Sequence, residues 1–105
     1  MQVLDRENQE IILLGDTNCD ILLNYSDGDG LNIVLPAHSM RILELYDLFG
    51  FHQLIKRGTR ETLGSTNLID HIATTNRSNI LTSGVHETSI NDHYMVYCVR
   101  KFRWA

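Results

Sequence analysis

The sequence predicts a mixed α/β or α+β fold with one helix and about one mixed or antiparallel sheet. Three observations support this prediction. Residues 11–14 form a continuous apolar run of strand length, and residues 36–49 place apolar side chains at helical spacing. Three segments rich in β-branched and aromatic residues follow late in the chain, at 68–75, 80–86 and 94–102. Because no helical pattern separates these last strands, we expect antiparallel pairing there.

The first part of the chain contains one predicted strand between two polar segments. Residues 1–9 are polar and compatible with the end of a helix. The run at 11–14 does not alternate with polar residues, so we expect its strand to be covered on both faces, with Gly15 turning the chain. Residues 24–32 (NYSDGDGLN) are rich in turn formers and are predicted to form a loop.

The central part is predicted to contain the helix, a short strand and a loop. Four apolar residues define the expected buried face of the helix: Ile42, Leu45, Tyr46 and Phe49. Gly50 suits the helix stop. Residues 52–55 predict a short strand, and the basic, glycine-containing residues 56–65 predict a loop. No linker, repeat or low-complexity tract interrupts the chain, so we treat 1–105 as a single unit.

The composition limits the classes of function. Hydrophobic residues make up 43% of the chain, which is enough for a core, and 13 acids against 9 bases give a formal charge of −4. This balance argues against attachment to nucleic acid through a broad basic face. No apolar run approaches the roughly 20 residues of a membrane span. The acidic, polar N-terminus is unlike a signal peptide, so an intracellular location, nucleus or cytoplasm, is expected.

The two cysteines, Cys19 and Cys98, have no metal-binding spacing, which argues against a zinc finger. Reduced thiols are expected in an intracellular protein, and a single disulfide stays open.

Three polar clusters lie at the edges of predicted strands: Asp16-Thr17-Asn18, Asp70-His71 and Asp92-His93. Acids at strand ends are typical of α/β enzyme sites. They suit phosphate ester hydrolysis, since carboxylates hold Mg²⁺ and can take a proton from attacking water. A histidine can stabilise charge that develops on phosphate oxygens, and a second carboxylate can fix its tautomer.

Each cluster also has a structural interpretation that the residues alone leave open. Asp16 and Asn18 are common in turns, where they cap backbone amides. Asp70 interrupts an apolar segment and needs a partner, which a structural salt bridge would supply. Asp92 and His93 are equally compatible with a solvated turn.

Together the clusters resemble the endonuclease/exonuclease/phosphatase superfamily. The motifs are GDTN at 15–18, TR at 59–60, LIDHI at 68–72 and NDHYMV at 91–96. The chain is most similar to the apurinic-type endonuclease domain of non-LTR retrotransposons, and the likeness covers nearly its whole length. This resemblance implies a four-layer sandwich, with two sheets face to face and helices outside.

The resemblance also implies roles at matching positions. Asp16 would orient or deprotonate the attacking water and Asn18 would contact phosphate. Asp92 would be the metal-associated acid, with Asp16 as a second metal-associated residue. His93 would contact phosphate, and Asp70 would pair with it.

Thr59 and Arg60 match a Thr-Arg pair on a loop near the DNA, so they are expected to bind substrate. Asn91 stands where the family usually has Ser. The implied metal is Mg²⁺, with Mn²⁺ as a substitute, and the implied partner is DNA.

The motifs correspond to the C-terminal half of the family domain, so 1–105 is expected to be a truncated domain. Glu7 and Glu10 precede GDTN too closely to be the family's metal-binding glutamate. A sheet face would then lie uncovered, and would pair with an N-terminal fragment or with a second copy.

Three functions follow from this interpretation. The first is a metal-dependent endonuclease that nicks DNA, incomplete in this chain. The second is a catalytically inactive truncated remnant. The third is a weak DNA- or phosphate-binding module that uses Asn18, Arg60 and His93.

Overall fold

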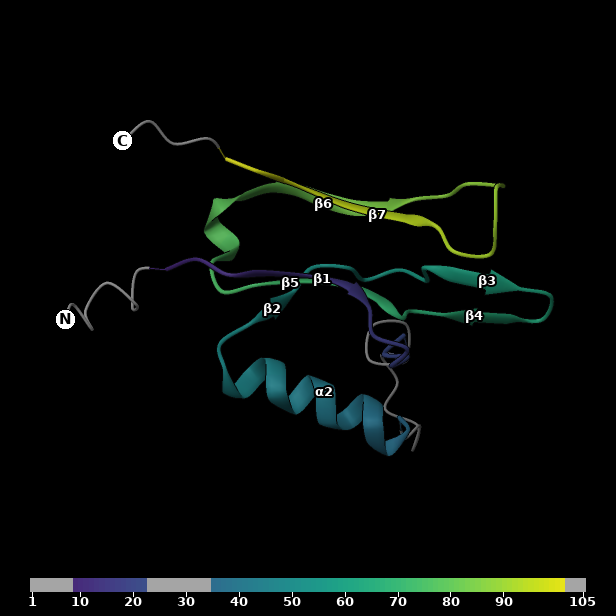
Figure 1. The fold of residues 1–105 in the computed structure, drawn as a ribbon, viewed down its shortest axis with the longest axis horizontal. Helices are drawn as coiled ribbons and strands as arrows, with labels where there is room; N and C mark the ends of the chain where they lie inside the picture. Colours follow the sequence, from purple (N-terminus) through teal and green to yellow (C-terminus); the bar gives the residue numbers. More distant parts are fainter. Residues whose placement is uncertain (1–8, 23–34, 102–105) are drawn as a thin grey trace.

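A computed structural model describes residues 9–22 and 35–101 (Figure 1). Its elements in chain order are β1 (Ile12–Asp16), α2 (Ala37–Leu48), β2 (His52–Gln53), β3 (Arg60–Thr62), β4 (Ser65–Asn67), β5 (Asp70–Thr74), the 3-10 helix η2 (Arg77–Asn79), β6 (Ile80–His86) and β7 (Met95–Arg100). The mixed α+β class is therefore confirmed. The predicted loop at 24–32 and residues 1–8 of the predicted helix end lie outside the described residues.

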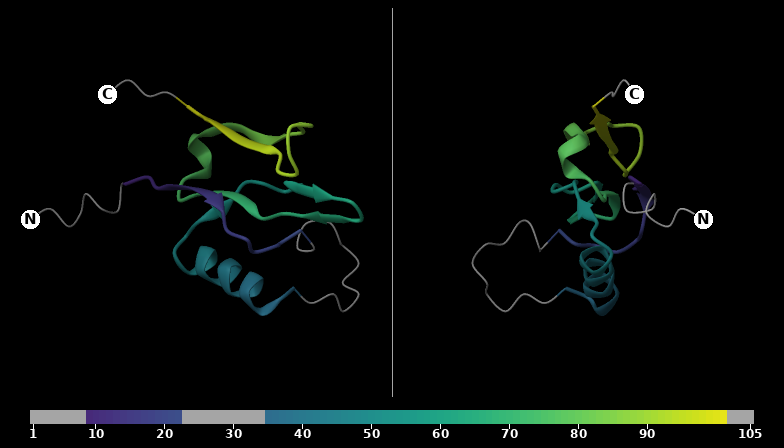
Figure 2. Two further views of the ribbon diagram at one scale, coloured as in Figure 1. Left: turned by 45° about the vertical axis from the view of Figure 1, so that its right-hand side comes forward. Right: turned by 90° about the vertical axis from the view of Figure 1, so that its left-hand side faces the viewer.

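The strands form several small antiparallel sheets where the sequence predicted about one. A three-stranded sheet has the order β1-β5-β2, and β3–β4 and β6–β7 are two-stranded. Antiparallel pairing late in the chain is confirmed by the β6–β7 hairpin. Figures 1 and 2 show α2 on one side of the three-stranded sheet and the β6–β7 hairpin on the other.

The core lies between these layers. Among the described residues, four fully buried aliphatic side chains form its central cluster: Ile21, Ile55, Leu68 and Ile72. Partly buried residues from β1, α2 and both strands of the β6–β7 hairpin surround them, including Ile12, Ile42, Leu43, Val85, Val96 and Cys98. Burying each of the four core side chains contributes roughly 1.5–3 kcal/mol. Elements from all three layers therefore fix the ends of β1 and β5.

The helix α2 forms where the sequence predicts it, and its expected buried face is confirmed in part, because Tyr46 is buried and Ile42 packs against the core. Ser39 and Tyr46 are its buried residues, whereas Leu45 and Phe49 are exposed. Gly50 follows the helix with a φ of +73°, a conformation that glycine adopts at little cost, so the predicted helix stop is confirmed. Tyr46 selects this face because its ring meets the buried His71 across the layer boundary.

The prediction of a continuous loop at 56–65 was wrong. Residues 60–62 and 65–67 pair as the β3–β4 hairpin, and Gly64 in its turn has a φ of +82°. The most recognisable two-residue hairpin turn is Asn-Gly or Asp-Gly, with positive φ at both central positions. Here the pair is Leu63-Gly64 and Gly64 alone has positive φ, so that signal was missing from the sequence.

The expectation that the first strand is covered on both faces was also wrong. β1 is an edge strand whose Leu13 and Leu14 are 46% and 68% exposed. The thiols of Cys19 and Cys98 are free and half-buried. Within the described ranges, neither α2 nor any other helix has the length and hydropathy of a transmembrane span.

Candidate functional site

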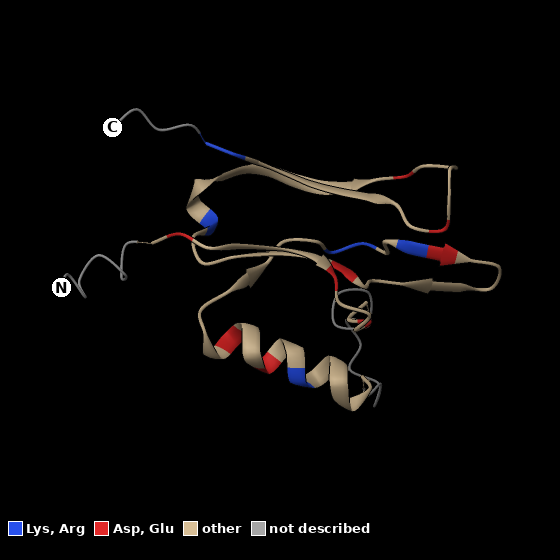
Figure 3. Ribbon diagram, viewed as in Figure 1, with Lys and Arg blue, Asp and Glu red and all other residues tan. Residues whose placement is uncertain are grey.

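Two aspartates face each other where β1 ends and β5 begins. The antiparallel register pairs Asp16 with Asp70, and Gly15 with His71. Directly opposed residues of an antiparallel pair point to the same face of the sheet, and like charges in such a pair destabilise it. The fold therefore concentrates negative charge at one end of the central sheet, beside β3 and the β6–β7 connection (Figure 3).

His93 lies against both aspartates. Its Nδ1 is 3.0 Å from Asp70 Oδ2, and its Nε2 is 4.0 Å from Asp16 Oδ2. Because an ionised carboxylate only accepts, Nδ1 carries the hydrogen and donates it to Asp70. The Asp70 side chain is 14% exposed while those of His93 and Asp16 are 34% and 50% exposed, so the cluster opens outward from Asp70.

The position of His93 depends on backbone pairing with the start of the β3–β4 hairpin. The N–H of Tyr94 donates to the carbonyl of Thr59 at 2.6 Å, and the N–H of Glu61 donates to the carbonyl of Asp92 at 2.8 Å. The Asn91 side chain caps the turn by accepting from the N–H of His93 at 2.8 Å. Asparagine side chains commonly cap turns in this way.

Thr59 fixes the backbone at Asp70. It is fully buried, and its hydroxyl oxygen accepts hydrogen bonds from the N–H groups of Ile69 and Asp70 at 3.1 and 3.0 Å. In this structure the residue predicted to bind substrate fixes the backbone of the second aspartate and does not reach the surface.

Asn18 follows Asp16 on the rim. Its N–H donates to Asp16 Oδ1 at 2.9 Å, and its φ is +55°, a left-handed conformation that asparagine tolerates better than most residues. This is the Asx turn that the structural interpretation of the cluster expected. The exposed Asn18 side chain lies two residues beyond the Asp16 carboxylate.

Arg60 and Asp92 form an ion pair next to the cluster and not within it. Arg60 Nε lies 2.9 Å from Asp92 Oδ2. The Arg60 guanidinium holds the pKa of the Asp92 carboxyl below its ordinary value. Among the described residues, Asp16, Asp70 and His93 form a group that could share a cation, since their ligand atoms lie within 4.8 Å of one another. Asp92, predicted to be metal-associated, faces Arg60 instead.

Asp20 is a structural acid outside the predicted site. Its carboxylate accepts from the N–H groups of Leu22 and Leu68 and from the Asn67 amide, at 3.0, 2.8 and 2.8 Å. Burial alone would raise the pKa of Asp20, but the hydrogen bonds from Leu68, Asn67 and Leu22 outweigh it and lower that pKa. Asp20 thereby ties the segment after β1 to the segment before β5.

His71 is buried on the helix side of the sheet. Its Nδ1 accepts from the Tyr46 hydroxyl at 2.9 Å, and its Nε2 donates to the carbonyl of Leu68 at 3.2 Å. Burial lowers the pKa of the imidazole, and the Leu68 carbonyl offsets this only in part. His71 is therefore a neutral packing residue that joins α2 to β5.

Two shallow depressions border the acidic cluster. One of about 300 Å³ is lined by residues of the β6–β7 connection, including His93 and Asn91. The other, of about 280 Å³, lies between β1 and α2 and includes Asp16 and His71. A group bound near the cluster would reach it from the open side formed by Asp16 and His93.

No protein-family model, curated protein or solved structure matches the chain.

Proposed function

We propose that the Asp16–Asp70–His93 cluster is a site for metal-dependent hydrolysis of a DNA phosphodiester, as in the endonuclease/exonuclease/phosphatase superfamily. The observation that carries this proposal is His93, held by Asp70 on one side and turned towards Asp16 on the other. Residues that the sequence separates by more than 70 positions meet at this point, which a set of independent turn caps would not require.

In this proposal His93 stabilises the phosphate. Asp70 accepts the Nδ1 hydrogen and thereby fixes the orientation of the ring. As an imidazolium, His93 then has one further hydrogen, on Nε2, to donate to a non-bridging phosphate oxygen. Such a donor favours the transition state because negative charge grows on those oxygens during attack.

Asp16 is the residue that would act on water. Its Oδ1 accepts the N–H of Asn18, which leaves Oδ2 facing the open side of the cluster. Asp16 would take a proton from the attacking water as the oxygen–phosphorus bond forms. The bond between phosphorus and the 3′ oxygen would then break, and the 3′ oxygen would leave and take up a proton from solvent.

The donor set fits Mg²⁺ or Mn²⁺ in part. Mg²⁺ binds through one or two carboxylates together with water and substrate phosphate, and Asp16 offers one uncommitted oxygen. A bound cation would offset the charge of the phosphodiester. Among the described residues Asp70 is engaged by His93 and Asp92 by Arg60, so Asp16 is the carboxylate that would hold the ion.

The layered fold supports a sandwich of this superfamily's type. A helix, a sheet and a second sheet follow one another in space, and core residues join them. We propose that 1–105 forms part of such a four-layer domain, within the cell and in the nucleus or cytoplasm.

Binding without turnover is the second candidate function. It is favoured by the engagement of Asp70 with His93 and of the neighbouring Asp92 with Arg60, which leaves Asp16 for the cation. In that case Asn18, Arg60 and His93 contact DNA phosphate, and the chain is an inactive remnant of a nuclease.

A plasmid-nicking assay separates these functions. We expect slow conversion of supercoiled plasmid to open circles with Mg²⁺ or Mn²⁺, and a loss of at least about 10²-fold in Asp16→Asn and His93→Ala. Asp47→Asn, an exposed acid on α2, is the matched control and should keep the wild-type rate. Metal-dependent nicking that survives in both site variants contradicts the proposal. DNA binding without nicking favours the second function.

A further inference from the structure

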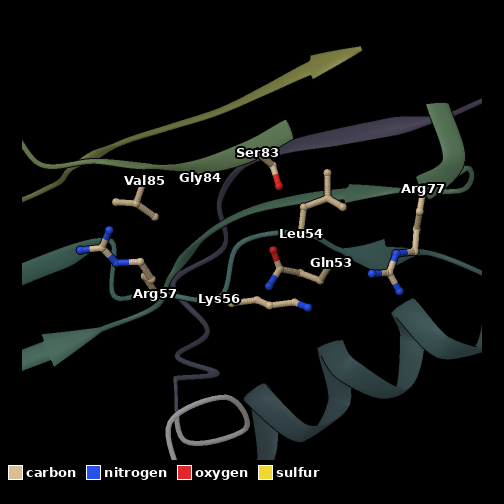
Figure 4. A pocket seen from close by; sticks show the side chains of 8 residues that line it. All are labelled: Gln53, Leu54, Lys56, Arg57, Arg77, Ser83, Gly84 and Val85. Carbon is tan, nitrogen blue, oxygen red and sulfur yellow. The ribbon is translucent and has the colours of Figure 1, made fainter. Parts of the chain in front are cut away.

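A basic groove lies between β2 and β6, away from the acidic cluster. It is a cavity of about 320 Å³ whose lining includes Gln53, Lys56, Arg57, Arg77 and Ser83. Figure 4 shows Lys56 and Arg77 facing the same stretch of the groove, with Arg57 at its other end and the Ser83 hydroxyl pointing in from β6. The three cations are exposed, so a ligand can reach them from solvent.

The lining holds three positive charges and no carboxylate. Arg57 alone among them has an acidic partner within the described residues, Glu87 at 2.9 Å, and that ion pair is exposed on both sides. Lys56 and Arg77 face one space without a counter-charge, and their repulsion is relieved by an anion placed between them. This concentration of cations stands out in a chain whose formal net charge is −4.

The fold builds this groove from separate parts of the chain. Lys56 and Arg57 follow β2, Arg77 begins η2, and Ser83 is on β6. Gln53 has already used both ends of its amide on the Ile55 backbone, so it fixes the β2 end of the groove and is not a free donor. Two cationic groups and a hydroxyl remain to meet a ligand, a combination that suits the oxygens of a phosphate group.

We propose that this groove binds phosphate groups of a DNA backbone, as a contact separate from the acidic cluster. Phosphate is favoured over other anions by the mixed guanidinium, ammonium and hydroxyl donors. A polymer is favoured because the groove runs from Arg77 to Arg57 and so leads towards the acidic cluster. Glu87, the partner of Arg57, begins the connection that carries His93. The choice of DNA as the source of phosphate rests on the proposed function.

The test measures binding of a fluorescent DNA duplex by anisotropy between 50 and 200 mM NaCl, without divalent metal. We expect Lys56→Gln/Arg77→Gln to weaken binding and to lower the slope of log K against log[salt] by about 1–2, since each lost phosphate contact removes about 0.9. Arg41→Gln, an exposed cation on α2, is the control and should leave the slope unchanged. Thermal melts of each variant check that it is folded.

An unchanged slope and affinity in the double variant overturns the proposal, as does a wild-type chain that fails to bind the duplex. A second arm titrates inorganic phosphate. If phosphate stabilises the wild type but not the double variant while both bind DNA equally, the ligand is a free phosphate and the DNA assignment is overturned. Because the assay involves no turnover, its result is independent of whether Asp16 and His93 support cleavage.

Discussion

At the scale of single residues, the candidate site depends on one imidazole between two opposed carboxylates. Asp16 and Asp70 occupy paired positions on β1 and β5, an arrangement that costs free energy unless a cation lies nearby. His93 lies against both carboxylates and hydrogen-bonds to Asp70, and the buried Thr59 fixes the backbone of Asp70. The side chains nearest the proposed chemistry are therefore held by buried hydrogen bonds, while Asp16 stays open to solvent.

Asp20 allows a test of the carboxylates that support the site. We expect Asp20→Ala to lower the free energy of unfolding by about 1–3 kcal/mol near neutral pH. The N–H groups of Leu68 and Leu22 and the Asn67 amide would then lose their acceptor. The folded pKa of Asp20 lies below 3.8, so its contribution is complete above that value and is lost as the pH falls through the folded pKa. Urea unfolding of both proteins at pH 6.5 and pH 3 measures the difference.

Asp47→Ala, an exposed acid on α2, is the control for Asp20→Ala and should show a small difference at both pH values. An Asp20→Ala difference that is equal at pH 6.5 and pH 3 would contradict the role assigned to its hydrogen bonds.

At the scale of elements, the sequence was informative where a pattern is local. The helix and its glycine stop were predicted from spacing alone, and the strands around Asp70 and His93 from β-branched content. The face of α2 was predicted only in part: Tyr46, which bonds to His71 25 residues away, is buried as expected, whereas Leu45 and Phe49 are exposed.

The candidate site was predictable to the same extent. Asp16, Asp70 and His93 each lie at the edge of a predicted strand, but the residues alone left their roles open, and only the resemblance to a known family grouped them into one site. The Arg60–Asp92 pair and the basic groove were not foreseen, because they depend on how the β3–β4 hairpin and η2 sit against β6. Such non-local contacts have no signature in residue spacing.

The β3–β4 hairpin gives a prediction at this scale, since it anchors the segment that carries His93. We expect Gly64→Val to lower the free energy of unfolding by about 1–2 kcal/mol, because a φ of +82° is costly for a β-branched residue. No heavy atom outside its chain neighbours lies within 4 Å of a Cβ added at Gly64, so crowding is not the cause. Gly64→Asn should cost less, since asparagine tolerates this conformation. Equal stability of Gly64→Val and the wild type, measured by urea unfolding, would contradict this.

At the scale of the whole molecule, the outer layer is apolar on both faces. Along β7, Val96 and Cys98 point into the core, whereas Met95, Tyr97 and Val99 alternate with them and are 59%, 41% and 45% exposed. Tyr97 lies opposite Gly84 and its hydroxyl covers that glycine. A strand that is apolar on both faces is typical of a sheet covered on both sides, and among the described residues no element covers the outer face of β6–β7.

This exposed face predicts that the purified chain self-associates, because in such a solution only a second copy is available to cover it. We expect sedimentation velocity to show dimers or larger species that grow with concentration, and a hydrophobic dye to bind. Tyr97→Lys/Val99→Lys places charges on the exposed face without entering the core, so it should shift the population towards monomer and reduce dye binding.

Leu63→Lys, at the fully exposed tip of the β3–β4 hairpin, is the matched control and should associate as the wild type does. A wild-type chain that stays monomeric at about 100 μM and binds no dye would show that this face is stable in water, and the uncovered layer would then need no partner.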